Sequence, residues 1–178
     1  MAETCPTLKP VLNADQCMEN FAGLADVAYV GVKSDLQAAM TATKNQYSAP
    51  TFKEGKGLYQ LDCKTKTQGI TGTSQGFRKG YELQFDFTID AVNADTSEAA
   101  RALNNLDVFF IVPDGEKYQI MYSPIRRVEA DSGAIKSDTG KQPTDDRVTS
   151  FSFKMGPVAY PNYYVDITDI NELLATEV

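Results

Sequence analysis

The sequence of 178 residues contains no histidine, no tryptophan and only three cysteines. Without histidine there is no Ser-His-Asp triad, no Cys-His pair and no His-ligated zinc. A closed structural zinc site takes four ligands, and Cys5, Cys17 and Cys63 form no Cys-x-x-Cys pair. We also find no carboxylate, lysine or tyrosine pair placed for acid–base chemistry. The sequence therefore predicts a protein that is not an enzyme and that holds no metal or cofactor.

The odd number of cysteines is typical of reduced thiols in a protein from a reducing compartment. A disulfide between Cys5 and Cys17 is the alternative. The first six residues lack the basic and apolar regions of a secretory signal. No stretch approaches the roughly 20 apolar residues of a membrane span. We therefore expect a protein made in the cytoplasm, with no membrane partner.

Positive charge is also scarce, with 17 Lys and Arg against 24 Asp and Glu and a formal net charge of −7. Holding nucleic acid requires clustered Lys and Arg, so we expect no specific binding to DNA, although DNA can pass such a surface. The glycine-rich stretch 69–80 lacks the spacing of a phosphate-binding loop. The acidic stretch 131–146 lacks the tight oxygen spacing of a calcium loop.

Residues 81–90 alternate strictly between apolar and polar side chains, which indicates a long, half-buried β-strand. Its polar side is either a sheet face turned to bulk water or a face that lines an enclosed space. Neighbouring carboxylates on one sheet face repel one another and resist association with anionic surfaces. The polar positions are Glu82, Gln84, Asp86, Thr88 and Asp90.

The rest of the chain predicts a mainly β (α+β) fold. We expect a helix over 96–105, a buried strand over 106–112, a turn at 113–116 and a return strand over 117–122. Together these elements favour a β-sandwich or partly open barrel with a short flanking helix, in one domain over 21–178 that follows an irregular N-terminal arm over 1–20. Two long polar loops are expected at 41–57 and 130–147. Further strands are predicted over 26–33, 58–66, 68–73, 148–155 and 163–167, with short helices over 35–40 and near 168–174.

Three stretches, which cover most of residues 20–165, match one protein family in order and character. They are Phe21-Ala-Gly-Leu-Ala-Asp-Val-Ala-Tyr-Val with Lys33-Ser-Asp-Leu; Phe85-Asp-Phe-Thr-Ile with the helix, Asn105-Leu-Asp-Val-Phe-Phe-Ile-Val-Pro-Asp and Lys117-Tyr; and the loop from Ser132-Gly to Asp138-Thr-Gly before Thr149-Ser-Phe-Ser-Phe-Lys. In these features the chain resembles the major tail tube proteins of tailed bacteriophages, in particular those from phages of gut Bacteroidetes. Most members carry a glycine soon after the return strand, where this chain has Tyr122-Ser123-Pro124.

The resemblance implies a ring-forming structural protein of the virion. Homo-hexameric rings would stack into a tail tube, assembled in the cytoplasm of the bacterial host, and DNA would pass through its lumen without specific binding. The polar side of strand 81–90 would face the lumen, and the two loops and the arm would contact neighbouring copies and other tail proteins. The residues that we expect at contacts between subunits are Tyr47, Phe52, Arg126, Arg127, Ile135 and Lys136.

Two other classes fit the same sequence features. One is another ring-forming virion protein, such as a head–tail connector, a tail terminator or a capsid decoration protein. The other is a carbohydrate-binding β-sandwich in which Tyr160, Tyr163 and Tyr164 stack on sugars. Lectin sites commonly use tryptophan, which this chain lacks, and packing in the core or at an interface is the alternative role for these tyrosines.

Overall fold

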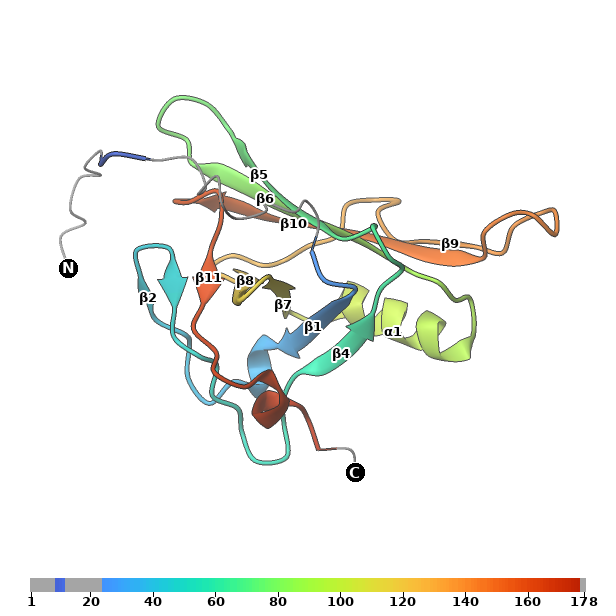
Figure 1. Cartoon of the computed structure of the whole chain (residues 1–178), viewed down its shortest axis with the longest axis horizontal. Coiled ribbons are helices and arrows are strands. Elements are labelled where there is room, and N and C mark those ends of the chain that lie inside the picture. The colour runs from blue at the N-terminus through green and yellow to red at the C-terminus, as the bar shows by residue number, and fades with distance from the viewer. Residues whose placement is uncertain (1–8, 12–23, 177–178) are drawn as a thin grey trace.

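The computed structural model describes residues 9–11 and 24–176 and places them in two β-sheets with one α-helix (Figure 1). Apart from residues 9–11, the predicted arm over 1–20 lies outside the described residues, as do Cys5 and Cys17. The elements are β1 (Val27–Val32), η1 (Lys33–Asp35), β2 (Ala42–Thr43), β3 (Gln46–Tyr47), β4 (Tyr59–Asp62), β5 (Gly69–Ser74), β6 (Tyr81–Ile89), α1 (Ala94–Asn105), β7 (Val108–Asp114), β8 (Lys117–Met121), β9 (Lys136–Asp138), β10 (Val148–Val158), β11 (Tyr164–Val165) and η2 (Ile170–Leu173).

The smaller sheet has four antiparallel strands in the order β5-β6-β10-β9. The larger sheet has seven, in the order β2-β3-β11-β8-β7-β1-β4, and only its β3–β11 pair is parallel among the described strands. Figure 1 shows the four-stranded sheet lying across one side of the seven-stranded sheet. The prediction of a mainly β fold with one short α-helix is confirmed, and the described strands form no closed barrel.

Aromatic side chains join the two sheets. The register pairs Phe87 with Phe151 and Phe85 with Phe153, so the apolar sides of β6 and β10 face the same way. The Phe110 ring of β7 meets them from the other sheet, with centroids 5.2 Å from Phe85 and 4.9 Å from Phe153. All five rings are buried. Burial of this much apolar surface is the main source of stability of the sandwich.

The strand β7 is buried on both faces, which explains its continuous apolar run. On the side away from the four-stranded sheet, the Phe109 ring packs against Tyr122 and Phe52, with centroid distances of 5.6 and 6.4 Å. Gly31 lies opposite Phe109 in the register. A Cβ atom at Gly31 would stand 2.6 Å from Cε1 of Phe109, so only glycine fits beside this ring.

The helix α1 begins at Ala94, two residues before the predicted start. Asn93 and Thr96 form a capping box, in which the Asn93 side chain accepts from the Thr96 N–H and the Thr96 hydroxyl accepts from the Asn93 N–H. The described residues contain no helix that is long and apolar enough to span a membrane.

The predicted helix over 35–40 is wrong. The chain makes one 3-10 turn at Lys33–Asp35 and then extends, so that Leu36 pairs with Phe52 in a β-bridge. The Gln37 N–H donates to the Thr51 carbonyl at 2.8 Å, a hydrogen bond that the returning chain supplies in place of a helix. The predicted loops 41–57 and 130–147 contain the short strands β2, β3 and β9.

Candidate functional surface

The outward side of the four-stranded sheet is polar across three strands. Along β6, the buried Leu83, Phe85 and Phe87 alternate with half-buried polar residues. The register brings small or polar residues of β5 and β10 beside them. We call this surface the polar face. It consists of Gly69, Thr71, Thr73, Glu82, Gln84, Asp86, Thr88, Ser150, Ser152 and Lys154.

Hydrogen bonds between side chains connect neighbouring residues of the polar face, both along β6 and between β6 and β10. The Gln84 amide Nε2 lies 3.0 Å from each carboxylate oxygen of Asp86 and 3.2 Å from Oγ of Ser152. The hydroxyls of Thr88 and Ser150 are 3.4 Å apart. The hydrogen bonds that involve Ser152 and Ser150 join the side chains of β6 to those of β10 across the polar face.

The polar face carries a negative charge. Its one cation, Lys154, places Nζ 2.9 Å from the Asp131 carboxylate at the edge of the sheet. That hydrogen bond, together with the charges of Asp131, Glu82 and Asp86, raises the pKa of Lys154. Among the described residues, Glu82 and Asp86 have no Lys or Arg nitrogen within 4.0 Å. Both carboxylates therefore add negative charge to the polar face without an ion-pair partner among the described residues, and such charge disfavours the approach of phosphate groups.

Asp90 differs from the other four residues that were predicted to face the lumen. It lies one residue beyond the end of β6 and is exposed. Lys64 places Nζ 3.8 Å from Asp90 and 2.9 Å from Asp146. Glu82, Gln84, Asp86 and Thr88 share one sheet face, whereas Asp90 belongs to an ion-paired cluster at the end of the sheet.

The residues predicted at contacts between subunits fall into two groups. Tyr47 is buried against Tyr122 and Tyr163, and burial raises its pKa to about 12. Phe52 stacks on Phe109. The rings of Tyr47 and Phe52, which were predicted at contacts between subunits, therefore already pack within the chain.

The second group lies at the surface. Arg126, Arg127 and Lys136 are exposed, and Ile135 is half-buried against the core. The Arg126 carbonyl accepts a hydrogen bond from Nζ of Lys33. Lys136 pairs with Asp138 at 3.2 Å, and Arg127 places Nε 3.9 Å from the Asp107 carboxylate. Arg126 has no carboxylate oxygen within 4.0 Å among the described residues.

The loop between β9 and β10 is held by its own carboxylates. Asp145 Oδ2 accepts hydrogen bonds from the N–H groups of Lys141 and Gln142 at 2.8 and 2.9 Å, and these bonds lower the pKa of Asp145. The Gly140 N–H and then the Lys136 ammonium lower the pKa of Asp138. In the part of the chain that the structure describes, no three His, Cys, Asp or Glu side chains are grouped to hold a metal ion.

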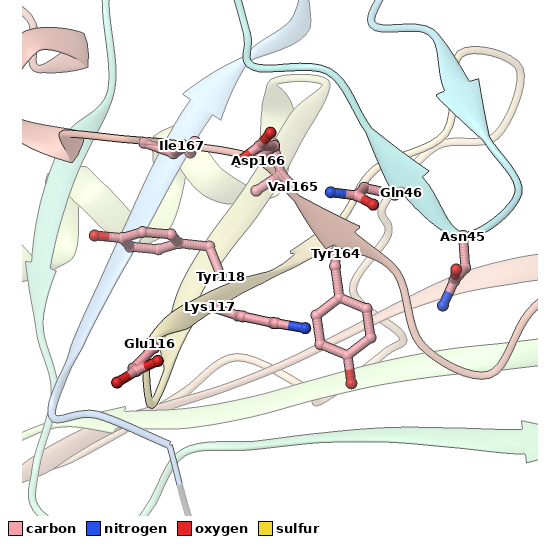
Figure 2. Close-up of a pocket in the computed structure, with 9 residues that line it drawn as sticks. All are labelled: Asn45, Gln46, Glu116, Lys117, Tyr118, Tyr164, Val165, Asp166 and Ile167. Carbon is pink, nitrogen blue, oxygen red and sulfur yellow. The ribbon is translucent and has the colours of Figure 1, made fainter. Parts of the chain in front are cut away.

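A polar depression of about 300 Å³ lies where β3, β8 and β11 meet (Figure 2). Tyr118 pairs with Val165 and Tyr164 pairs with Gln119, so the two tyrosines occupy opposite faces of the sheet. Figure 2 shows their rings pointing in different directions. Tyr163 is buried, and its hydroxyl accepts from the N–H groups of Ala159 and Tyr160. Tyr160 packs edge-on against Tyr163, with ring centroids 5.7 Å apart, so packing within the chain already engages two of the three tyrosines of the sugar-binding alternative.

The residues of β5 and β10 that lie beside β6 on the polar face were not among the residues predicted to face a lumen. The alternation of Ser150, Ser152 and Lys154 with apolar residues was visible in the sequence, but only the register places them beside Gln84 and Asp86. A search of family models, curated proteins and solved structures found no match to this chain. Function is therefore inferred from the polar face, the open edges of its sheet and the exposed apolar side chains.

Proposed function

We propose that this chain is a structural subunit of the tail tube of a tailed bacteriophage. Copies of the chain form hexameric rings, and the rings stack into a hollow tube in the virion tail. The polar face of every copy lines the lumen, through which DNA passes. The chain catalyses no reaction in this role and requires no cofactor.

The polar face is the observation that carries the proposal. A lumen that conducts DNA must not hold it, so it needs short polar side chains, negative charge and no unpaired cations. Glu82 and Asp86 supply the charge, and the one lysine is engaged by Asp131. A surface that grips nucleic acid has the opposite character, with clustered and unpaired Lys and Arg.

The edges of the four-stranded sheet support assembly. Among the described strands, β5 pairs only with β6 and β9 pairs only with β10, so each has one edge without a partner strand within residues 9–11 and 24–176. An open edge presents unpaired N–H and C=O groups that accept another strand. Pairing edge to edge around a ring would join the polar faces into one continuous inner wall.

The accessibility of two engineered thiols tests this orientation. Thr71 is exposed on the polar face, and Glu172 is exposed in η2, on the side of the molecule away from the four-stranded sheet (Figure 1). In monomers, we expect Thr71→Cys and Glu172→Cys to react both with a small maleimide and with a maleimide on a polymer too large for the lumen. In assemblies, Thr71→Cys should react only with the small reagent, whereas Glu172→Cys should react with both.

Peptide mapping by mass spectrometry scores each site separately from the native cysteines. Protection of Thr71→Cys from both reagents would place the polar face in a contact between copies instead of a lumen. Unchanged reaction of Thr71→Cys with the large reagent would place it on the outside of the assembly. Either result contradicts the proposed orientation.

A further inference from the structure

The turn between β5 and β6 presents an aromatic side chain to solvent. Phe77 is 90% exposed, the highest value among the large apolar side chains that the structure describes. The turn is well defined, because the Gln75 N–H donates to the Gly80 carbonyl at 2.9 Å and the Lys79 N–H donates to the Gly76 carbonyl at 3.1 Å. A large apolar side chain held outward by an ordered turn is typical of a contact with another molecule.

Two cations follow this ring directly. Arg78 and Lys79 are exposed, and no carboxylate among the described residues lies within 4.0 Å of either side chain. The tip of the hairpin therefore combines one apolar ring with two unpaired positive charges. We call residues 76–79 the hairpin tip.

An apolar groove of about 560 Å³ lies between α1 and the strands β1 and β4. Two of its large side chains, Tyr59 and Leu106, are each 46% exposed. A groove of this size accepts an aromatic side chain. The apolar residues that line it are Val30, Val32, Tyr59, Leu61, Ala99, Ala102, Leu103, Leu106 and Val108, and the polar ones are Ser34, Asp35, Lys56 and Gln60.

The helix side of the groove ends in negative charge. Asp95 and Glu98 precede Ala99 and Ala102 by four residues each, so they continue the stripe of α1 that lines the groove. Both carboxylates are exposed, and no described Lys or Arg nitrogen lies within 4.0 Å of them. With Asp35 and Lys56 of the lining, three carboxylates and one ammonium surround the groove. The groove is thus complementary to the hairpin tip in polarity and in net charge.

The hairpin tip cannot reach the groove of its own chain. The turn precedes the first residue of β6, and α1 follows the last, so the nine residues of β6 separate the two features. A strand of that length spans about 30 Å. Figure 1 shows the β5–β6 turn and α1 toward opposite ends of the molecule.

The geometry points to a head-to-tail contact in which Phe77 of one copy enters the groove of a second copy. Arg78 and Lys79 then face Asp95 and Glu98 across the contact. Because the two surfaces differ, each copy offers both, and the contact repeats to form a closed ring or a filament. This inference rests on the proposed self-assembly and names the surfaces that carry it.

Charge exchange provides the first test. We expect Arg78→Glu/Lys79→Glu and Asp95→Lys/Glu98→Lys each to weaken self-association at least about tenfold, because like charges then face one another. An equal mixture of the two variants should associate again, since every contact between unlike copies pairs opposite charges. Sedimentation velocity of the full chain measures both effects.

A matched variant controls for the effect of net charge in general. Asp166→Lys/Glu172→Lys makes the same charge change as Asp95→Lys/Glu98→Lys, at exposed positions outside the groove. It keeps the wild-type hairpin tip and groove, so it should self-associate as the wild-type chain does. An equal loss of association in Asp166→Lys/Glu172→Lys and Asp95→Lys/Glu98→Lys would show that net charge, and not this contact, drives the effect.

Photo-crosslinking identifies the groove directly. With p-benzoylphenylalanine at position 77, mixed light and heavy isotope copies should give crosslinks between copies that map to 59–61 or 99–106. The same group at Ile125, which is 84% exposed, serves as the matched position and should not label those residues. Crosslinks from position 77 to residues 1–23, or only within one copy, would overturn the inference.

The two proposals fail in different ways. If the wild-type chain forms hollow tubes that the charge exchanges leave unchanged, the head-to-tail contact is wrong and the tail tube function stands. If crosslinks map to the groove but the chain forms only open filaments or discrete closed rings, the contact stands and the tube function is wrong. A wild-type chain that stays monomeric at every concentration overturns both.

Discussion

Replacing Phe110 with alanine is expected to lower the free energy of unfolding of the monomer by about 3–5 kcal/mol. Phe110 is fully buried and touches Phe85, Phe87 and Phe153, so its removal leaves a cavity between the two sheets. For a domain of this size, the loss corresponds to a fall in Tm of about 6–20 °C. Urea and thermal unfolding followed by circular dichroism measure it, at a concentration below assembly so that mass action adds no stability.

Phe77→Ala is the matched control. It makes the same chemical change at a ring that is 90% exposed, so its effect on unfolding should stay within about 0.5 kcal/mol. Equal losses from Phe110→Ala and Phe77→Ala would contradict the assignment of the core. The control also separates stability from assembly, because Phe77→Ala is expected to weaken only association.

Reversing the charge of the polar face has the largest expected effect on function. Glu82→Lys/Asp86→Lys places two cations per copy on the proposed lumen wall, and these cations attract phosphates at every ring. We expect tubes to form normally, while DNA release from particles built with this variant slows at least about tenfold, in a salt-dependent manner. The rate of DNA release after triggering, measured at two salt concentrations, tests the prediction.

Asp166→Lys/Glu172→Lys is the matched control, because it makes the same charge change as Glu82→Lys/Asp86→Lys on the side away from the proposed lumen. It should leave DNA release unchanged, because those residues lie in the C-terminal region beside the seven-stranded sheet (Figure 1). A Glu82→Lys/Asp86→Lys variant that folds and cannot assemble would show that the polar face is a contact surface. Normal DNA release from such particles would exclude it from the lumen.

The long strands were predictable because their patterns are strong. The alternation over 81–90 predicted β6 and its polar side, and the continuous apolar run predicted β7. A turn was predicted over 113–116, but β7 continues through Pro113 and Asp114, so only Gly115 and Glu116 form the turn before β8. For β6 and β7 the local pattern and the buried surface in the structure agree, so tertiary contacts reinforce what the sequence favours locally.

The short strands β2 and β3 were not predictable, because they are set by contacts distant in sequence. β2 and β3 have two residues each, too few to show a period. β11 lies within the strand predicted over 163–167, and the structure limits it to the two residues that lie between β3 and β8. A contact distant in sequence also made the helix prediction over 35–40 wrong. Ser34 and Asp35 resemble a helix start, but pairing with 51–53 determines the backbone there.

Part of the candidate site also could not be predicted from the sequence. The polar positions of β6 followed from alternation, whereas the Lys154–Asp131 pair joins two segments that no local pattern connects. Phe77 lies in a glycine-rich stretch that resembles a flexible connection, and the ordered turn that holds it outward emerges only in three dimensions. The groove requires β1, β4 and α1 together.

Negative-stain electron microscopy of the purified full chain across a concentration series tests the central claim most directly. The proposed function predicts six-fold rings with an open lumen that stack into tubes as concentration rises. Discrete rings that never stack would instead indicate a connector or terminator, and a chain that stays monomeric throughout would indicate a decoration or binding protein. Either of these two results would contradict the tail tube function.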